Sequence, residues 1–192
     1  MTPEEDAIRQ LHEKDSTARR QAADRLGAIG GASAVEPLVQ ALRDEDWGVR
    51  TIAEHSLWQI WCRSGDGTAD ALMQEGIEAL ERKTWAKAVA TFTQVIERVP
   101  EFAEGYNKRA TTYYLMGKYA QAIADCDATI ARNPHHFGAL SGEGLCYLAL
   151  GQLRTARDCF RRALAVNPNM PGVEQNLAAV ERALHAGGNG FD

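Results

Sequence analysis

The sequence predicts an all-α protein, an α-solenoid in which helical hairpins stack in chain order. Three prolines, Pro100, Pro134 and Pro168, stand 34 residues apart in a chain of 192 residues. Small and large apolar residues recur at fixed distances before each proline, which predicts one helical hairpin repeated three times. Such a hairpin cannot bury its apolar face alone, so we expect stacking on neighbours to form the core.

The residue types at the repeated positions fit this packing. A small residue stands where two helices are expected to approach closely: Gly76, Ala110 and Gly144. A second set of small residues does the same on the following helix: Ala88, Ala122 and Ala156. Phe92 and Phe160 are expected to fill the space between hairpins, whereas Cys126 stands at the same position in the second repeat and fills it less well.

The pattern resembles the tetratricopeptide repeat, which reads W-x2-L-G-x2-Y, then A-x3-F, then P, over 34 residues. The motif Leu140-x2-Glu143-Gly144-x2-Tyr147 carries the resemblance together with its two earlier copies. The resemblance implies three repeats at 69–102, 103–136 and 137–170. A further amphipathic helix at 171–185 is expected to cap the stack, and 186–192 to be a disordered tail.

Residues 1–65 resemble HEAT repeats of the short, phycobilisome-lyase type. Asp15-x3-Arg19 recurs as Asp46-x3-Arg50, and Asp15 and Asp46 are placed to cap helices. Ala34-Val35-x-Pro37-Leu38 reads as the second helix of a unit, after a break at Gly27–Gly31. Lyase activity does not follow from this resemblance, because the short form occurs widely as plain scaffold.

Residues 64–68 are a glycine-containing turn of about five residues rather than a flexible tether. We therefore expect residues 66–185 to continue the N-terminal array in one solenoid. The predicted junction packs three apolar residues, Leu57, Trp58 and Trp61, against Leu72 and Leu80.

The family resemblance implies a concave groove, lined by the first helix of each hairpin, as the site for a protein or peptide partner. The implied lining residues are Asp70, Met73, Gln74, Ile77, Glu104, Asn107, Lys108, Thr111, Tyr114, Ser141, Gly142, Leu145 and Leu148. Any one of these is also compatible with a merely solvated or packing role. Some relatives clamp a peptide's terminal carboxylate with lysines, asparagines and an arginine. This chain lacks that set, having Met73, Ile77, Lys108, Thr111, Gly138 and Gly142 at those positions.

Alternating charges occupy one equivalent position in the three repeats: Glu75, Arg109 and Glu143. Successive hairpins lie about 10 Å apart, a gap that a long arginine can span. One hypothesis is a structural ladder with Arg109 between the two carboxylates. The alternative is three solvated side chains that never meet.

Other function classes find little support. The formal net charge of −5 and the lack of a basic patch argue against nucleic acid, and no apolar run reaches the ~20 residues of a membrane span. Neither a catalytic arrangement nor a cofactor motif is recognisable, and His135-His136, with no third ligand nearby, reads as polar turn filler rather than as a metal site. The four cysteines lack paired C-x-x-C spacing, so we expect buried thiols in a reducing, cytoplasmic compartment.

The sequence thus predicts a non-catalytic scaffold that binds a peptide or protein segment in its groove, as a monomer. Two alternatives stay open. One is an accessory subunit of an enzyme or assembly complex, of a lyase-type, photosynthetic or chaperone-like kind, that uses the HEAT-like face. The other is a repeat module that associates with itself.

Overall fold

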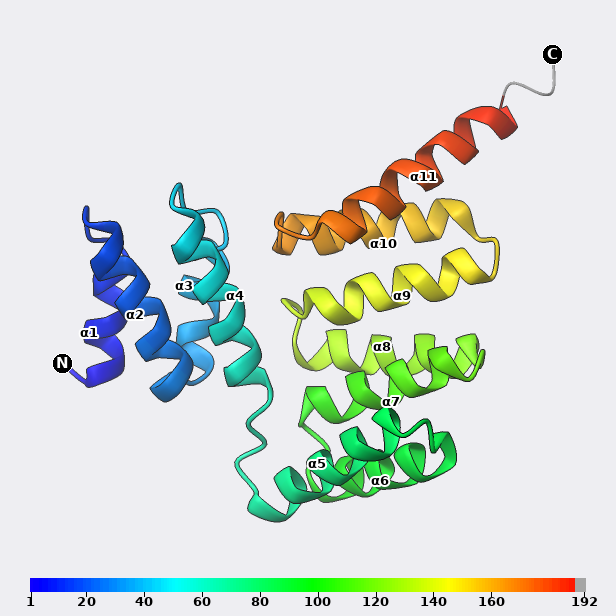
Figure 1. Cartoon of the computed structure of the whole chain (residues 1–192), viewed down its shortest axis with the longest axis horizontal. Helices are drawn as coiled ribbons and strands as arrows, with labels where there is room; N and C mark the ends of the chain where they lie inside the picture. The colour runs from blue at the N-terminus through cyan, green and yellow to red at the C-terminus, as the bar shows by residue number, and fades with distance from the viewer. Residues whose placement is uncertain (189–192) are drawn as a thin grey trace. The chain divides into compact units, whose positions relative to one another are not determined.

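The computed structural model of the chain describes residues 1–188. Every regular element among them is a helix, and Figure 1 labels these helices α1 to α11 in chain order. The predicted all-α fold class is confirmed. The chain divides into two compact units, of which the first holds α1–α4 and the second holds α5–α11. The packed junction expected between the two arrays stays a prediction.

Four helices make up the first unit. The helices α2 and α4 begin at the aspartates that the sequence predicted as caps, since Asp15 accepts the Thr17 N–H at 3.0 Å and Asp46 accepts the Val49 N–H at 2.9 Å. The bounds are α1 (Pro3–Gln10), α2 (Ser16–Ile29), α3 (Ala32–Ala41) and α4 (Trp47–Trp61).

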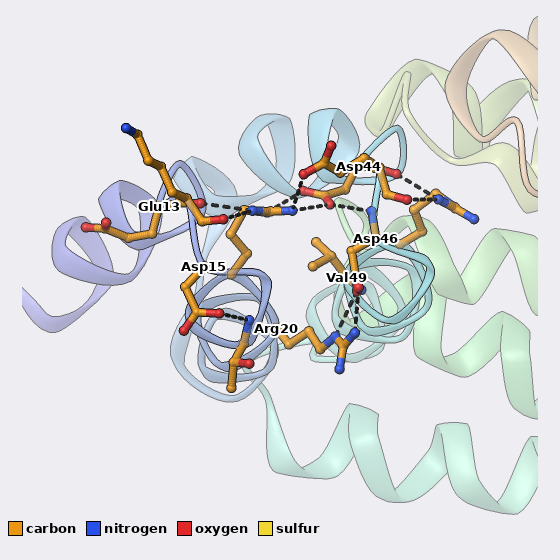
Figure 2. Close-up of polar contacts among 11 residues, drawn as sticks. Glu13, Asp15, Arg20, Asp44, Asp46 and Val49 are labelled. Atoms are coloured by element: carbon orange, nitrogen blue, oxygen red, sulfur yellow. Dashed lines mark hydrogen bonds and ion pairs between the residues drawn. The ribbon is translucent and has the colours of Figure 1, made fainter.

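A buried arginine joins the turns of the first unit. Arg19 is 7% exposed, and its Nε and Nη2 each donate to Asp44 at 2.8 Å. Its Nη1 donates to the backbone carbonyls of Glu13 and Lys14 at 3.0 and 2.9 Å (Figure 2). Removing one partner of such a buried pair typically costs about 3–5 kcal/mol, because the other charge is left without compensation. The first D-x-x-x-R motif is therefore a structural device.

The second D-x-x-x-R motif repeats the same backbone contacts. Arg50 Nη1 donates to the carbonyls of Asp44 and Glu45 at 2.8 and 3.1 Å, the residues six and five positions before it, as Arg19 does with its own turn. Arg20 Nε donates to Asp46 at 2.8 Å, so α2 also binds the cap of α4 (Figure 2). The repeated sequence motif thus corresponds to a repeated turn.

The break predicted at Gly27–Gly31 begins later than expected. Helix α2 runs through Gly27 to Ile29, and the chain leaves the helix at Gly30. Gly27 is buried, and a Cβ there would lie 2.6 Å from the Ser56 Oγ of α4. Ile29, the last residue of α2, is 47% exposed. Gly27 therefore permits close helix packing rather than ending the helix.

In the second unit, three helical hairpins are followed by one further helix (Figure 1). The hairpins are α5–α6, α7–α8 and α9–α10, and the further helix is α11. The bounds are α5 (Gly67–Glu81), α6 (Trp85–Arg98), α7 (Ala103–Leu115), α8 (Tyr119–Arg132), α9 (Phe137–Ala149), α10 (Leu153–Val166) and α11 (Pro171–Gly188).

The turns inside the three hairpins share a left-handed residue at one repeated position. Gly117 and Gly151 have φ of 71° and 72°, while Lys83 takes the same place in the first hairpin with φ of 58°. Glycine adopts this conformation without a Cβ clash, whereas lysine does not. The first hairpin therefore holds local strain that the other two avoid.

In the first and third hairpins, the glycine at the predicted close-approach position contacts the phenylalanine of the same hairpin, which was expected to fill the space between hairpins. A Cβ on Gly144 would lie 2.6 Å from Cε1 of Phe160, and a Cβ on Gly76 would clash with Phe92 in the same way. Both phenylalanines are fully buried. The second hairpin has Ala110 at the glycine position instead.

The last helix, α11, packs on α10. Val173 and Val180 are buried in one cluster with Phe160 and Ala163 of α10, as expected of a capping helix. The helix extends to Gly188, beyond the predicted end at residue 185, so the first part of the predicted tail is helical. Residues 189–192 of that tail lie outside the described residues.

Candidate functional site

A cavity of about 310 Å³ lies among α7, α8 and α9. It includes six of the predicted groove residues, contributed by the first helices of the second and third hairpins. The complete lining is Asn107, Ala110, Thr111, Tyr114, Leu115, Cys126, Gly138, Ser141, Gly142, Leu145 and Cys146. The structure therefore gathers most of the second- and third-repeat positions around one hollow.

The cavity has a simple origin in side-chain size. Cys126 stands where the other two repeats have a buried phenylalanine, and its side chain is much shorter than a benzyl group. Across the hollow, Gly142 has no side chain, and a Cβ there would lie 3.7 Å from Cys126 Sγ with no other atom within 4 Å. Two small residues facing each other thus leave space that the repeat pattern would otherwise fill.

Three polar side chains of the cavity each have one donor in use. Thr111 Oγ1 donates to the Asn107 carbonyl at 3.0 Å, and Ser141 Oγ donates to the Gly138 carbonyl at 3.0 Å. Asn107 Nδ2 donates to Glu104 Oε2 at 3.1 Å, which leaves its Oδ1 as an acceptor. Hydroxyl and amide oxygens keep free lone pairs after these bonds. The cavity therefore presents the oxygens of Thr111, Ser141 and Asn107 as acceptors, beside the Tyr114 hydroxyl and the second amide N–H of Asn107.

Behind Asn107 lies a buried ion and hydrogen-bond cluster. Glu104 and His136 are both fully buried, with 2.9 Å between Glu104 Oε2 and His136 Nε2. His136 Nδ1 accepts the Ala139 N–H at 3.0 Å, so Nε2 carries the proton given to Glu104. Burial raises the pKa of Glu104, but the hydrogen bond from His136 and the charge of Lys108 outweigh it, and the pKa lies below its ordinary value. Glu104 is thus an ionised core residue.

Two predicted groove residues have other roles. Glu104, expected to face a partner, is buried away from the cavity, because the amide and imidazole beside it provide partners that water would otherwise supply. Lys108 Nζ lies 3.1 Å from Glu104 Oε1 as an ion pair outside aligned hydrogen-bonding geometry. The charge of Lys108 is therefore largely committed within the protein.

His136 corrects the prediction of polar turn filler. Its side chain caps the start of α9 while its ring reaches Glu104 on α7, so it links the second and third repeats. One signal was available in the sequence. The equivalent residue of the preceding turn is Phe102, which is also buried, so this position belongs to the core.

The first-repeat groove residues do not reach the cavity. Gln74 is exposed on α5, and Ile77 packs against the apolar cluster of the first hairpin. Met73 is a buried member of the same cluster. Leu148 of the third repeat packs against the cluster of α9 to α11. The cavity thus begins at the second repeat.

The predicted charge ladder is wrong, because Arg109 does not pair with either glutamate. Arg109 Nε and Nη2 donate to the two oxygens of Asp125 at 2.8 Å, and its Nη1 donates to Thr93 at 3.0 Å. Glu75 lies 2.9 Å from Lys87 Nζ. Like these two, Glu143 binds the second helix of its own hairpin.

The ion pairs of the repeated position lie within each hairpin, and the contact of Arg109 with the preceding hairpin is its hydrogen bond to Thr93. Glu143 Oε2 lies 3.4 Å from Arg162 Nη1, and burial raises the pKa of Glu143. The sequence held a signal for the real pairing of Arg109. The residue sixteen positions later is Asp125 in the second repeat but Thr91 and Cys159 in the other two. The one repeat with a basic residue at this position is therefore also the one with an acidic residue sixteen positions later.

Three thiols belong to the core. Cys126, Cys146 and Cys159 are buried, and burial is the largest cause that raises the pKa of each, to about 11 for Cys146 and about 12 for Cys159. Cys62, also predicted to be buried, is exposed at the end of α4. The three buried thiols are therefore protonated packing groups at neutral pH.

Residues 1–188 offer neither a metal-binding cluster nor a membrane-spanning helix. That part of the chain contains no group of three or more His, Cys, Asp or Glu side chains that could hold a metal ion. Its helices are all too short or too polar to cross a bilayer.

The fold and its cavity define the class as a helical repeat protein with a hollow on the first helices of its hairpins. Residues 73–136 and 107–171 match the family model of the tetratricopeptide repeat, and together they span just over half of the chain. The chain belongs to the tetratricopeptide repeat family. Residues 4–58 match the model of HEAT repeats, as the N-terminal motifs predicted.

The relatives of known name or structure match part of the chain. A TPR repeat-containing protein of Rhizobium etli is 32% identical over 108 residues, which are 56% of this chain and 53% of that protein. The first TPR of Spaghetti (RPAP3) bound to an HSP90 peptide is 26% identical, with a TM-score of 0.60, over 61% of this chain and 93% of that one. The TPR2B domain of yeast Sti1 in complex with pHsp70 is 25% identical, with a TM-score of 0.58, over 62% and 99%. This chain spans about half the length of the Rhizobium relative.

Proposed function

We propose that this protein is a non-catalytic interaction module that binds an extended segment of a partner protein along α7 and α9. The observation that carries the proposal is the cavity, which is lined by residues of both helices and has Leu115, 51% exposed, on its lining. A concave site with an apolar lining and a few oriented polar groups is the usual form of a binding pocket.

The solved relatives support a peptide as the class of partner. One of them is bound to the HSP90 peptide SRMEEVD, and another forms a complex with pHsp70. Their partners do not transfer directly, because the carboxylate-clamp positions of this chain are mostly uncharged: Met73, Ile77, Lys108, Thr111, Gly138 and Gly142. The one cation among them is Lys108, which is paired with Glu104. The proposed partner is therefore an internal segment rather than a chaperone's acidic C-terminal tail.

A matched pair of surface variants tests the site. Leu115→Glu places a charge beside the cavity, while Leu150→Glu makes the same change at an equally exposed leucine outside the lining. Random 12-residue peptides displayed on phage, selected on the wild-type chain, supply the ligands. We expect the selected peptides to bind wild type and Leu150→Glu alike and Leu115→Glu at least tenfold more weakly. Equal binding to all three proteins would refute the site.

Two finer features complete the proposal. We place the protein in the cytoplasm, which the burial of Cys126, Cys146 and Cys159 as protonated packing thiols supports. The absence of catalysis is supported by the tetratricopeptide relatives, including the heat shock protein STI1 of Saccharomyces cerevisiae, which is 31% identical over 62% of this chain and 20% of that protein. Assays of the purified chain with its selected peptides should show binding and no turnover.

A further inference from the structure

We infer that the cavity is a subsite for one uncharged apolar side chain of the bound segment, and that the oxygens around it receive the segment's backbone N–H groups. This rests on the proposed function and adds the chemistry of the ligand. The occupant is an extended segment of another protein with an aliphatic or aromatic anchor residue, and neither end of that segment is recognised.

The size of the cavity favours a single side chain. Its volume of about 310 Å³ lies at the lower end of the ~300–1,000 Å³ range of ligand pockets. The apolar part of the lining comes from Ala110, Leu115, Leu145 and the two thiols of Cys126 and Cys146. A side chain of the size of leucine or phenylalanine can enter this space, whereas a whole helix cannot.

The electrostatics exclude an acidic anchor. None of the eleven lining residues, all in the described part of the chain, carries a formal charge. Acidic groups lie around the hollow, since Glu143, Asp125 and Asp127 all act to raise the pKa of Cys126 after burial and Cys146. A carboxylate in this hollow would lose its water, and no lining residue carries a positive charge to compensate it.

The oriented oxygens specify what accompanies the anchor. Thr111 and Ser141 have given their hydroxyl protons to backbone carbonyls, and Asn107 has given an amide proton to Glu104. Glu104 is ionised, so its carboxylate can only accept hydrogen bonds. The amide of Asn107 therefore turns its nitrogen toward Glu104 and its oxygen away from Glu104. An extended peptide has one backbone N–H at nearly every residue, so its N–H groups can donate to the oxygens of Thr111, Ser141 and Asn107.

The position of Asn107 is fixed before any ligand arrives. Glu104 holds its amide, His136 holds Glu104, and both of these supporting side chains are fully buried. Groups that are already oriented lose less conformational freedom on binding. Asn107 is therefore a positioned contact rather than a mobile surface amide.

The test fills the cavity from either side. Gly142→Leu projects a side chain from α9 into the open space, and Gly172→Leu makes the same change where a Cβ meets no atom within 4 Å. The double variant Ala110→Gly with Cys126→Phe fills the hollow from the other side, using the residue pair that the first and third hairpins already pack. Circular dichroism and thermal melts establish that each variant is folded.

The probe is a selected 12-residue peptide, acetylated and amidated at its ends, titrated by calorimetry. Its apolar anchor is found by alanine scanning and is then changed to Ala and to Asp. We expect Gly142→Leu and the double variant each to weaken binding at least tenfold, which corresponds to about 1.4 kcal/mol. Gly172→Leu should bind like wild type. The anchor-to-Ala peptide should lose nothing further on Gly142→Leu, because both changes remove the same contact.

The outcomes separate the two proposals. Binding that Leu115→Glu abolishes but that Gly142→Leu and the double variant leave unchanged would overturn the subsite and keep the groove. Selected peptides that share an acidic residue or a free C-terminus as their anchor would also overturn it. Failure of every peptide to bind wild type, or indifference to Leu115→Glu, would overturn the proposed function and the subsite together.

Discussion

Two glycines of α9, only two residues apart, are expected to respond oppositely to the same substitution. Gly144 faces the buried ring of Phe160, and an added Cβ would lie 2.6 Å from Cε1 and 2.7 Å from Cδ1. Gly142 faces the cavity, and its Cβ would lie at an ordinary 3.7 Å from Cys126 Sγ. The perturbations are Gly144→Ala and Gly142→Ala, with the second as the matched control.

The magnitude follows from two opposing effects. Replacing glycine by alanine inside a helix stabilises it by about 1 kcal/mol, and both positions share this gain. Carbon atoms at optimal contact lie about 3.5–4.0 Å apart, so Gly144→Ala requires a shift of about 1 Å against a ring that is fully buried. Overpacking of this kind costs about 1–3 kcal/mol. Since the helix gain cancels, Gly144→Ala should be about 1–3 kcal/mol less stable than Gly142→Ala.

Urea unfolding followed by circular dichroism measures this difference, and hydrogen exchange of the α9 amides reports it locally. We expect Gly142→Ala to exceed wild type by up to about 1 kcal/mol. Adding Phe160→Leu should remove most of the penalty specific to Gly144→Ala in a double-mutant cycle. If both alanine variants stabilised the protein equally, the close contact between α9 and Phe160 would be wrong.

Four further predictions follow from single contacts. Arg109→Met should destabilise the protein by about 3 kcal/mol in urea unfolding, because it leaves Asp125 buried and unpaired, and adding Asp125→Leu should restore most of that stability. Lys83→Gly should stabilise the protein by about 1 kcal/mol and so raise its thermal midpoint, because it removes a left-handed backbone conformation from a lysine. An unchanged midpoint would argue against strain at this position. Deleting residues 171–192 exposes the apolar face of the third hairpin, so sedimentation should show association that grows with concentration, and a strict monomer would contradict the cap. The hydrogen bond from Arg98 lowers the pKa of Asp66 to about 2. The stabilisation that the ionised carboxylate provides is therefore present above the unfolded pKa of ~3.9 and is lost as pH falls toward 2. Asp66→Asn should flatten this part of the pH–stability curve.

Helix positions and hairpin packing followed from the sequence because they depend on local and repeated patterns. The caps at Asp15 and Asp46 are set by residues within one turn of the helix. The close approach of a neighbouring helix at Gly144 follows from the repeated small residue at that position, whereas its contact with Phe160 was not predicted. Where a repeat supplies several copies of the same environment, the agreement among copies specifies the packing.

The mistaken predictions concern the direction in which a side chain leaves its helix. Arg109 shares its repeat position with two glutamates, which suggested contacts down the stack, yet it binds Asp125 within its own hairpin. His136 and Glu104, two polar residues that were expected at a turn and in a groove, are buried against each other. A polar side chain can be buried only when a hydrogen-bond partner is buried beside it. His136 and Glu104 are 32 positions apart, so only tertiary packing brings them together.

By itself, the sequence determined that the chain is all-helical, that its repeats are of the tetratricopeptide and HEAT kinds, and that the second repeat departs from the pattern at Cys126. Only the tertiary structure decided that this departure opens a cavity, because a short side chain leaves space only if no neighbour moves into it. Gly142 on the next hairpin lacks the atoms to do so. The sequence thus shows which position lacks a large side chain, and the packing of the three helices keeps the resulting space open.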